Sequence, residues 1–176
     1  VSGACFAEFG AAVTCVDKDA TKIGALTKGE IPIYEPGLDD LVARNVRSGR
    51  LGFSTELKTA VAAADLVFIA VGTPTRRGDG YADLKYVYAA AEEIAGYLQG
   101  YTVIIDKSTV PVGTAREVHR IISKHNPSAE FDVASNPEFL REGSAISDFM
   151  RPDRVVLGVE SDRAEALLRE LYRPLN

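Results

Sequence analysis

Three acidic side chains in this 176-residue sequence stand where a carboxylate can do chemistry: Asp17, Glu138 and Glu142. Asp17 directly follows the apolar run 12–16, and a carboxylate at the end of a buried strand can accept hydrogen bonds from both hydroxyls of a ribose. Glu138 and Glu142 are four residues apart, a spacing that places two carboxylates on one face of a helix. We therefore expect a pair of carboxylates directed at a polar substrate.

Each placement also has a purely structural explanation. Acidic residues end many strands that bind no ligand. The pair Asn136–Pro137 is typical of a helix start, with proline at the first helical position. The helix dipole tolerates acidic residues near such a start, and Arg141 would screen the two glutamates. The sequence pattern thus predicts a helix beginning at Pro137 and leaves both explanations of its acidic residues open.

The elements that must position these side chains follow from alternating apolar runs and helical patterns. Strands are predicted at 12–16, 51–54, 66–71, 102–105, 131–134 and 155–159. Helices are predicted at 1–9, 21–26, 38–46, 84–98, 115–122 and 164–171, and a further alanine-rich helix is predicted to end near residue 64. Strands separated by helices cannot pair as hairpins, so the sheet is expected to be mostly parallel. The predicted fold class is α/β: one doubly wound, Rossmann-like domain.

Ligands of such sheets bind outside the carboxyl ends of the strands. Polar segments follow the predicted strands there: Asp17, then 72–75 (Gly-Thr-Pro-Thr), 106–109 (Asp-Lys-Ser-Thr) and 135–138 (Ser-Asn-Pro-Glu). Asp17 would also repel the 2′-phosphate of NADP, which selects NAD. The glycine fingerprint of a dinucleotide site precedes such an acid by roughly 20 residues, so we expect it, with the first strand, upstream of Val1.

Composition excludes several other classes of protein. The sequence has 25 acidic and 20 basic residues, a net charge of -5, and its cations are scattered, so a nucleic-acid partner is not expected. No apolar run approaches the roughly 18 to 20 residues that span a bilayer, so no membrane partner is expected and the predicted location is cytoplasmic. No cluster of metal-ligating residues is present. Cys5 and Cys15 are expected to be reduced, buried thiols without a basic neighbour, and neither is a candidate nucleophile.

Six segments, in order along the whole chain, resemble the amino-terminal NAD-binding domain of the nucleotide-sugar 6-dehydrogenases, the UDP-glucose/GDP-mannose dehydrogenase family. They are VSGACFAE (1–8), IPIYEPGL (31–38), FIAVGTPT (68–75), DLKY (83–86), KSTVPV (107–112) and SNPEFLRE (135–142), with PDR (152–154) beyond. The segment 33–36 looks more like the UDP-glucose branch. A GDP-mannose or other UDP-sugar dehydrogenase is the nearest alternative, and a non-catalytic dinucleotide-binding module is the alternative from another class.

The resemblance implies a reaction and a set of cofactor contacts. The family oxidises the 6-hydroxymethyl group of a nucleotide-bound sugar to a carboxylate with two NAD, through an aldehyde and a cysteine thioester. By matching position, Asp17 would hold the adenosine ribose of NAD, Lys22 would lie near the adenosine end, and Thr73 would line the cofactor. Thr109 and Glu142 would also contact the cofactor.

The resemblance further implies the catalytic and substrate contacts. Thr109 would position water or the reacting sugar, Glu138 would help to hydrolyse the thioester, and Glu142 would lie between cofactor and substrate. The segment expected to bind the substrate comprises Glu138, Phe139, Leu140, Arg141 and Glu142. The family's catalytic cysteine, its substrate domain and its central dimerisation helix are expected after residue 176, so residues 1–176 would form a partial NAD-binding domain, inactive alone and homodimeric or larger when complete.

Overall fold

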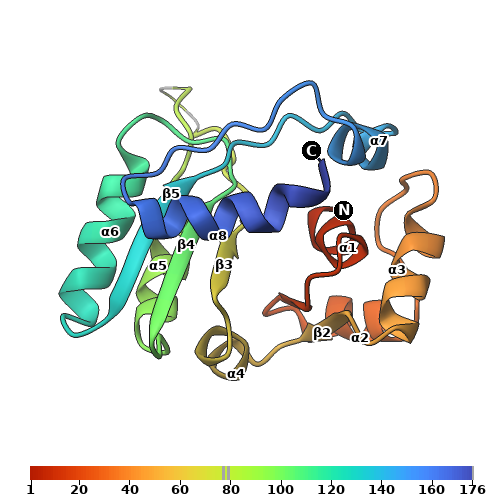
Figure 1. Cartoon of the computed structure of the whole chain (residues 1–176), viewed down its shortest axis with the longest axis horizontal. Coiled ribbons are helices and arrows are strands. Elements are labelled where there is room, and N and C mark those ends of the chain that lie inside the picture. The colour runs from red at the N-terminus through yellow and green to blue at the C-terminus, as the bar shows by residue number, and fades with distance from the viewer. Residues whose placement is uncertain (77, 79, 176) are drawn as a thin grey trace. The chain divides into compact units, whose positions relative to one another are not determined.

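The computed structural model describes residues 1–76, 78 and 80–175 (Figure 1). Their contacts divide the chain into two compact units, each built from segments distant in sequence. Unit 1 comprises Val1–Ala60, Phe139–Arg154 and Leu167–Asn176, and unit 2 comprises Val61–Glu138 and Val155–Ala166.

Unit 1 contains a parallel pair of strands, β1 (Val13–Val16) and β2 (Leu51–Ser54), in which Val13 lies opposite Leu51. Its helices are α1 (Ser2–Glu8), α2 (Ala20–Thr27), α3 (Leu38–Arg47) and α7 (Ala145–Met150); α4 (Leu57–Ala62) begins in this unit. Helix α1 approaches β1 closely, because a Cβ atom on Gly3 would lie only 2.6 Å from Cys15 Sγ. The small residues of α1 therefore permit the packing that supports the start of the chain.

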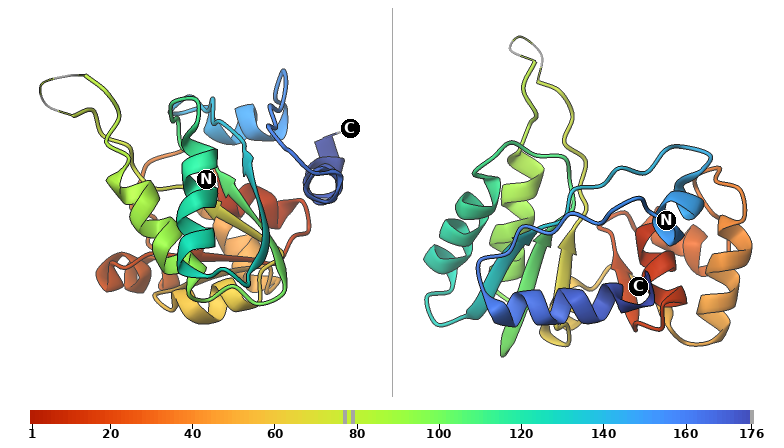
Figure 2. Two further views of the ribbon diagram at one scale, coloured as in Figure 1. Left: turned by 90° about the vertical axis from the view of Figure 1, so that its left-hand side faces the viewer. Right: turned by 45° about the horizontal axis from the view of Figure 1, so that its top comes forward.

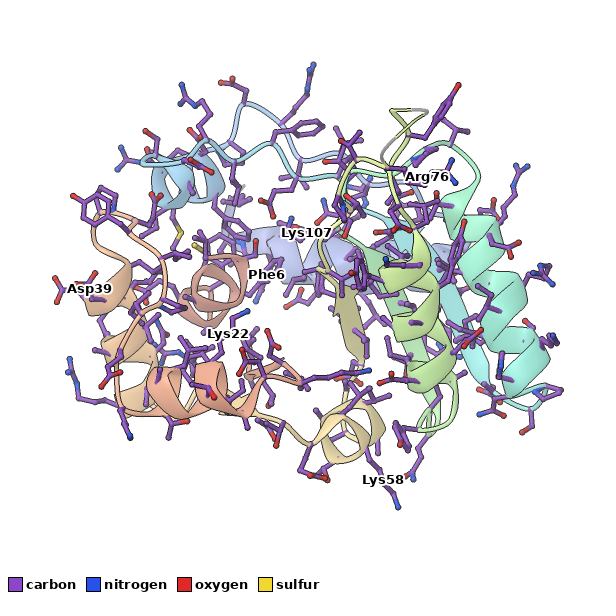
Figure 3. The ribbon with its side chains drawn as sticks, turned by 180° about the vertical axis from the view of Figure 1, so that it is seen from behind. Phe6, Lys22, Asp39, Lys58, Arg76 and Lys107 are labelled. Atoms are coloured by element: carbon purple, nitrogen blue, oxygen red, sulfur yellow. The ribbon has the colours of Figure 1, made fainter. Side chains whose placement is uncertain are left out.

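An aromatic cluster forms the core of unit 1. Phe6, labelled in Figure 3, meets Phe149 edge to face with ring centroids 5.0 Å apart. Tyr172, near the end of α8 (Asp162–Tyr172), packs against Phe6 at 5.5 Å. All three rings are buried. Edge-to-face pairs add to the hydrophobic free energy of burial, so this cluster joins α1 to α7.

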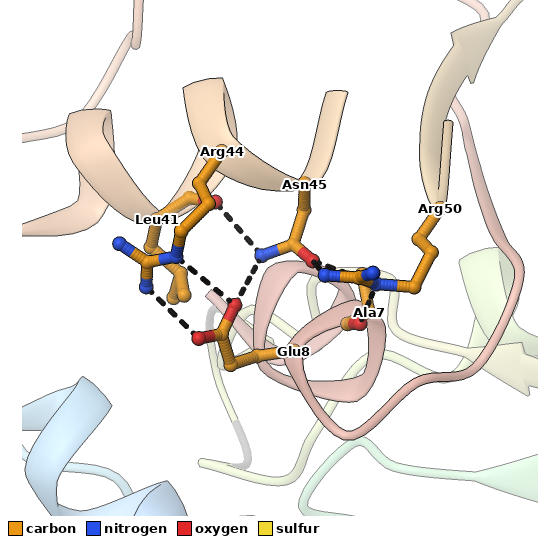
Figure 4. Close-up of polar contacts among 6 residues, drawn as sticks. All are labelled: Ala7, Glu8, Leu41, Arg44, Asn45 and Arg50. Carbon is orange, nitrogen blue, oxygen red and sulfur yellow. Dashed lines mark hydrogen bonds and ion pairs between the residues drawn. The ribbon is translucent and has the colours of Figure 1, made fainter. Parts of the chain in front are cut away.

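A polar network, shown in Figure 4, joins α1 to α3. Glu8 Oε2 accepts a 2.7 Å hydrogen bond from Asn45 Nδ2, and Arg44 pairs with Glu8 Oε1 at 3.0 Å. Asn45 Oδ1 accepts from Arg50 Nη2, and Arg50 Nε donates to the Ala7 carbonyl. The hydrogen bond from Asn45, followed by that from Arg44, lowers the pKa of Glu8. The carboxyl-terminal end of α1 is thus fixed by one fully buried amide.

Asn45→Ala is expected to lower the free energy of unfolding by about 2 kcal/mol, because it leaves polar partners inside the protein without their hydrogen bonds. The measurement is the shift in the denaturation midpoint. Lys58→Ala, an exposed position on α4, is the surface control, with an expected change below about 0.5 kcal/mol. Equal midpoints for the two variants would show that the network does not hold α1 in place.

Unit 2 contains three strands, all parallel, in the order β3 (Leu66–Ile69), β4 (Tyr101–Asp106) and β5 (Glu130–Ser135). The register places Ile69, Asp106 and Ser135 side by side, so the carboxyl ends of the strands align. Helices α5 (Lys85–Ala95) and α6 (Thr114–His125) cover one face of this sheet (Figure 2).

The start of α8 is tied to the same sheet. Asp132 Oδ2 on β5 accepts hydrogen bonds from Tyr101 Oη and from Ser161 Oγ, the latter at 2.6 Å. Ser161 Oγ in turn accepts from the Ala164 amide and caps the helix. The first turn of α8 lies on the opposite face of the sheet from α5 and α6 (Figure 2). A short 3₁₀ turn, Arg173–Leu175, follows α8.

The predicted parallel pairing is confirmed, but the described strands form two sheets instead of one. The predicted strand 155–159 is wrong. Within this segment the structure has only one isolated antiparallel bridge, between Ser135 and Gly158. A Cβ atom on Gly158 would lie 2.8 Å from Ser135 Oγ, so glycine at this position lets the two backbones approach closely. Glycine also disfavours a longer strand, because it has no side chain to pack.

The predicted helix at Pro137 is also wrong. Residues 136–141 have no regular structure and 142–144 form a turn, so Glu138 and Glu142 do not share a helix face. The helix does not form because the Asn136 side chain bonds elsewhere. Asn136 is buried and donates from Nδ2 to the Val156 carbonyl at 3.0 Å. Its Oδ1 accepts from Lys107 Nζ at 3.3 Å. The side chain that would cap the helix instead links the segment after β5 to Lys107, which follows β4, and to Val156.

Candidate functional site

The carboxyl end of β1 carries a carboxylate held in place by its own loop. Asp17 Oδ1 accepts a hydrogen bond from the Asp19 amide at 3.0 Å, and Oδ2 pairs with Lys22 Nζ at 2.6 Å. Asp19 caps α2 by accepting from the Thr21 and Lys22 amides, which brings Lys22, labelled in Figure 3, to this end of β1. The structure thus brings together two residues that the family resemblance assigns to the adenosine end of NAD.

The electrostatics at Asp17 suit a ribose. The hydrogen bond from Lys22, and then that from the Asp19 amide, lower the pKa of Asp17 below its ordinary value, so the group is ionised at neutral pH. About 36% of the side chain is exposed, which leaves it accessible to a ligand. An ionised, fixed and accessible acceptor is what two ribose hydroxyls require. The residues present therefore fit NAD at this position.

The carboxyl ends of β3 and β4 carry the two threonines that the sequence singled out. Thr73 Oγ1 donates to the Thr109 carbonyl at 3.5 Å, and Ser108 Oγ donates to the Val71 carbonyl at 2.8 Å. These bonds tie the segments 71–73 and 107–109 to one another. Thr109 is exposed and Thr73 is half-buried, and both lie in one loop cluster at the carboxyl end of β3 and β4.

Asp106, the last residue of β4, is buried and its Oδ2 has no hydrogen-bond partner among the described residues. Its Oδ1 accepts from the Ser108 amide at 3.1 Å, and so shapes the turn that leads to Thr109. Burial raises the pKa of Asp106, and the Ser108 hydrogen bond lowers it. The effect of burial is larger, so the pKa rises to about 6. The carboxyl is thus partly protonated near pH 6.

We expect Asp106→Asn to be more stable than the wild type at pH 7.5, by up to about 3 kcal/mol. The pKa of Asp106 is higher in the folded than in the unfolded chain, so its ionisation opposes folding. That cost is absent below about pH 4 and complete above about pH 6. Asparagine stays neutral and keeps an oxygen for the Ser108 amide. Melting temperatures measured from pH 4 to 8 should therefore converge at low pH, and a constant offset would contradict the prediction.

Lys107 is the other buried charged side chain in this loop cluster, and Figure 3 labels it. Its amide donates to the Ile69 carbonyl at 3.0 Å, and its Nζ donates to Asn136 Oδ1. The Asn136 amide donates to the Asp106 carbonyl at 2.9 Å, which extends the ladder between β4 and β5 by one residue. These bonds set where the chain leaves β5, directly before Glu138.

Glu138 and the four residues after it are not brought together on one element. Glu138 is exposed and belongs to unit 2, whereas Phe139, Leu140, Arg141 and Glu142 belong to unit 1. Phe139 is 65% exposed, so a large apolar ring faces solvent. Arg141 pairs with Asp148 of α7, with Nη2 2.6 Å from Oδ1 and Nε 3.0 Å from Oδ2. This pairing lowers the pKa of Asp148 to about 2.

Both cysteines are free thiols, but only Cys5 is buried as predicted, whereas Cys15 is half-buried. Cys5 is fully buried in α1, and burial raises the pKa of the Cys15 thiol, which disfavours the reactive thiolate. Among the described residues no group of three potential metal ligands lies together. In the same part of the chain no helix is long and apolar enough to cross a membrane.

Among the residues that the structure describes, three buried charged residues received no role from the sequence: Glu35, Asp106 and Lys107. Asp106 and Lys107 were visible only as polar residues after a strand, and nothing in their types distinguished buried from exposed. Glu35 lies in a proline-rich loop, and its partners are more than 100 residues away in the chain. Only tertiary contacts reveal such residues.

Comparison with known proteins places this geometry in a family. Residues 1–176 match the profile described as "UDP-glucose/GDP-mannose dehydrogenase family, NAD binding domain". The chain belongs to this family. As its NAD-binding domain, the chain supplies the part that carries the cofactor, consistent with the carboxylate at the end of β1.

Relatives and solved structures agree with this assignment. The chain is 68% identical over 177 aligned residues to the UDP-glucose 6-dehydrogenase of Rhizobium meliloti and 52% identical to UDP-glucose 6-dehydrogenase TuaD of Bacillus subtilis. It covers 40% and 38% of these proteins, while 99% and 100% of the chain is aligned. The chain therefore spans about 40% of the length of the curated relatives it matches.

The fold of the chain is that of solved members of the family. A UDP-glucose dehydrogenase from Pyrobaculum islandicum superposes with a TM-score of 0.95 at 42% identity, covering 99% of this chain and 41% of that one. A GDP-mannose dehydrogenase from Pseudomonas aeruginosa superposes with a TM-score of 0.94 at 35% identity, covering 99% and 42%. The α/β fold with parallel sheets is thereby confirmed.

Proposed function

We propose that the complete protein oxidises UDP-glucose to UDP-glucuronate in two NAD-dependent steps, through a thioester on a cysteine outside this chain. The observation that carries the proposal is the 68% identity, across essentially the whole chain, to a curated UDP-glucose 6-dehydrogenase. Residues 1–176 supply the cofactor-binding part. When bound, NAD accepts the hydride from the carbon that is oxidised.

The cofactor end of the proposal involves four residues. Asp17 accepts the hydroxyls of the adenosine ribose, and Lys22 keeps that carboxylate ionised and lies near the adenosine. Thr73, whose hydroxyl donates to the Thr109 carbonyl, also lines the cofactor. Glu142 contacts the cofactor from the segment after β5.

The catalytic end of the proposal uses the exposed groups beyond β4 and β5. Thr109 positions the reacting sugar or the hydrolytic water, and Glu138 accepts the proton of that water when the thioester is hydrolysed. Glu142 lies between cofactor and substrate. The substrate lies along Glu138–Glu142, with the exposed Phe139 ring and the neighbouring Leu140 and Arg141 as contacts.

We propose further that the first strand of the sheet and its glycine fingerprint precede Val1 in the complete protein. Both β1 and β3 pair on one edge only among the described residues, β1 with β2 and β3 with β4, so each has an edge that another strand can occupy. The dimerisation helix, the substrate domain and the cysteine would follow residue 176. The complete protein would be a cytoplasmic homodimer or larger assembly.

The test is an assay of the complete protein with NAD and a panel of nucleotide sugars. UDP-glucose is expected to yield two NADH per UDP-glucuronate. GDP-mannose is the second candidate substrate, because the fold matches a GDP-mannose dehydrogenase almost as closely. A preference for GDP-mannose would show that GDP-mannose, and not UDP-glucose, is the substrate. No NADH formation with any of these nucleotide sugars would favour the alternative of a non-catalytic dinucleotide-binding module.

A further inference from the structure

Glu35 is a buried carboxylate whose partners are backbone amides on the far side of the sequence. Its Oε2 accepts a hydrogen bond from the Gly143 amide at 2.8 Å, and its Oε1 accepts from the Ala145 amide at 2.8 Å. The Ile146 amide is 3.5 Å from the same Oε1. Only 6% of Glu35 is exposed, and hydrogen bonds to a charged acceptor are the stronger kind in such surroundings. All these residues belong to unit 1.

A second carboxylate holds the other side of the same turn. Asp148 Oδ2 accepts from the Arg141 amide at 3.0 Å, and the Arg141 guanidinium adds two further bonds to Asp148. The amide before Glu142 is therefore held by Asp148, and the amide after it by Glu35. Residue 142 is the one position that lies between the two fixed amides.

The backbone directly after Glu142 turns through a glycine in the left-handed region. Gly143 has φ +79°, a conformation that residues with side chains rarely adopt, and no other described residue between 139 and 150 has a positive φ. Glu142 itself is exposed at the start of this turn. Anchors on both sides of an exposed side chain are what hold it in one orientation.

We propose that Glu35 is a positioning residue, which together with Asp148 clamps the turn around Glu142 and so orients the Glu142 carboxylate for the reaction. This inference rests on the proposed function of Glu142 between cofactor and substrate. Glu35 does not contact the substrate in this scheme, because its oxygens are already occupied by the amides of Gly143 and Ala145. Its effect on the reaction passes through residue 142.

A plain stabilising role for Glu35 predicts different behaviour. The carboxylate forms part of the wall of a cavity of about 390 Å³ beside α7, together with Ser147 and Arg151. If Glu35 only supported this region, its loss would lower the melting temperature and leave the turnover of the folded enzyme intact. A positioning role instead predicts a loss of kcat that depends on Glu142.

The test is a double-mutant cycle in the complete protein with UDP-glucose and NAD. Glu35→Gln keeps the volume but replaces one acceptor oxygen with an amide donor, so one of the two short bonds is lost. We expect kcat to fall roughly 10- to 100-fold, because a misplacement of about 1 Å is that costly. In Glu35→Gln/Glu142→Gln, kcat should equal that of Glu142→Gln alone, since a displaced side chain that no longer reacts costs nothing more.

The matched control is Glu30→Gln, an exposed glutamate of the same unit, which should leave kcat unchanged. Asp148→Asn, which weakens the other anchor, should reproduce the dependence on Glu142 and replaces Glu35→Gln if that variant does not fold. Wild-type kcat in both anchor variants, or losses that multiply with that of Glu142→Gln, would overturn the inference.

Hydrogen exchange separates this inference from the proposed function. Exchange at the Gly143 and Ala145 amides should accelerate in Glu35→Gln and stay unchanged in Glu30→Gln, whatever the substrate is. Unchanged exchange in Glu35→Gln would overturn the clamp. If the wild-type protein oxidises no nucleotide sugar, the proposed function fails, and faster exchange would then leave Glu35 with a structural role only, which also overturns the positioning role.

Discussion

Glu138→Gln in the complete protein is expected to slow turnover by roughly 10²- to 10⁴-fold, the loss typical of removing a general base. Attack of water on a thioester needs a proton acceptor beside the water, and glutamine cannot accept that proton. In the proposed mechanism, the first oxidation does not depend on this group. In that mechanism, the thioester should therefore accumulate on the catalytic cysteine.

Rapid quench followed by mass spectrometry of the intact protein measures the adduct directly. Glu160→Gln, which removes an exposed carboxylate from the same unit, is the control and should show wild-type turnover with no adduct. Unchanged turnover and no adduct in Glu138→Gln would show that Glu138 is an exposed acidic residue with no catalytic role. Slow turnover without an adduct would assign it to an earlier step.

Replacing Asp17 with alanine is expected to weaken NAD binding roughly 10- to 100-fold, because hydrogen bonds to a charged group contribute about 1.5 to 3 kcal/mol. The preference for NAD over NADP should narrow at the same time. The ionised carboxylate that repels a 2′-phosphate is gone, and the Lys22 ammonium that paired with it at 2.6 Å becomes available to that phosphate.

Dissociation constants for both cofactors, measured by titration calorimetry on the complete protein, test this expectation. Asp40→Ala, an exposed aspartate of α3, is the control and should leave both constants unchanged. If the wild-type protein binds NADP as tightly as NAD, the assignment of Asp17 to the ribose is wrong. Equal losses for NAD and NADP in Asp17→Ala would mean that the carboxylate supports the loop without selecting the cofactor.

Local patterns were sufficient for most of the framework. The buried strands and amphipathic helices carry periodicities that depend on neighbours a few residues away, so β4 and α6 were found within a few residues of their bounds. Parallel pairing followed from the helical connections alone. Asp17 was placed directly after a strand for the same reason, because an apolar run that stops at an acid marks the strand's end.

The predictions that failed depended on contacts between distant residues. Asn136 before a proline is locally a good helix start, yet its amide group bonds to Val156 and Lys107, and the chain continues without a helix to Ser144. The run 155–159 is locally a good strand, yet Gly158 crosses Ser135 in a single antiparallel bridge. Long-range hydrogen bonds outweighed local propensity in both segments.

The sequence by itself determined the fold class, the family and the position of Asp17 at the end of β1, because these depend on order, periodicity and motif along the chain. Only the tertiary structure decided which charged groups are buried. It buried Asp106 at the end of β4 with an oxygen that has no partner among the described residues, and it joined Glu35 to amides more than 100 residues later. The type of a residue fixes what its side chain can bond to, but the partner that bonds to it is set by how the chain folds back on itself.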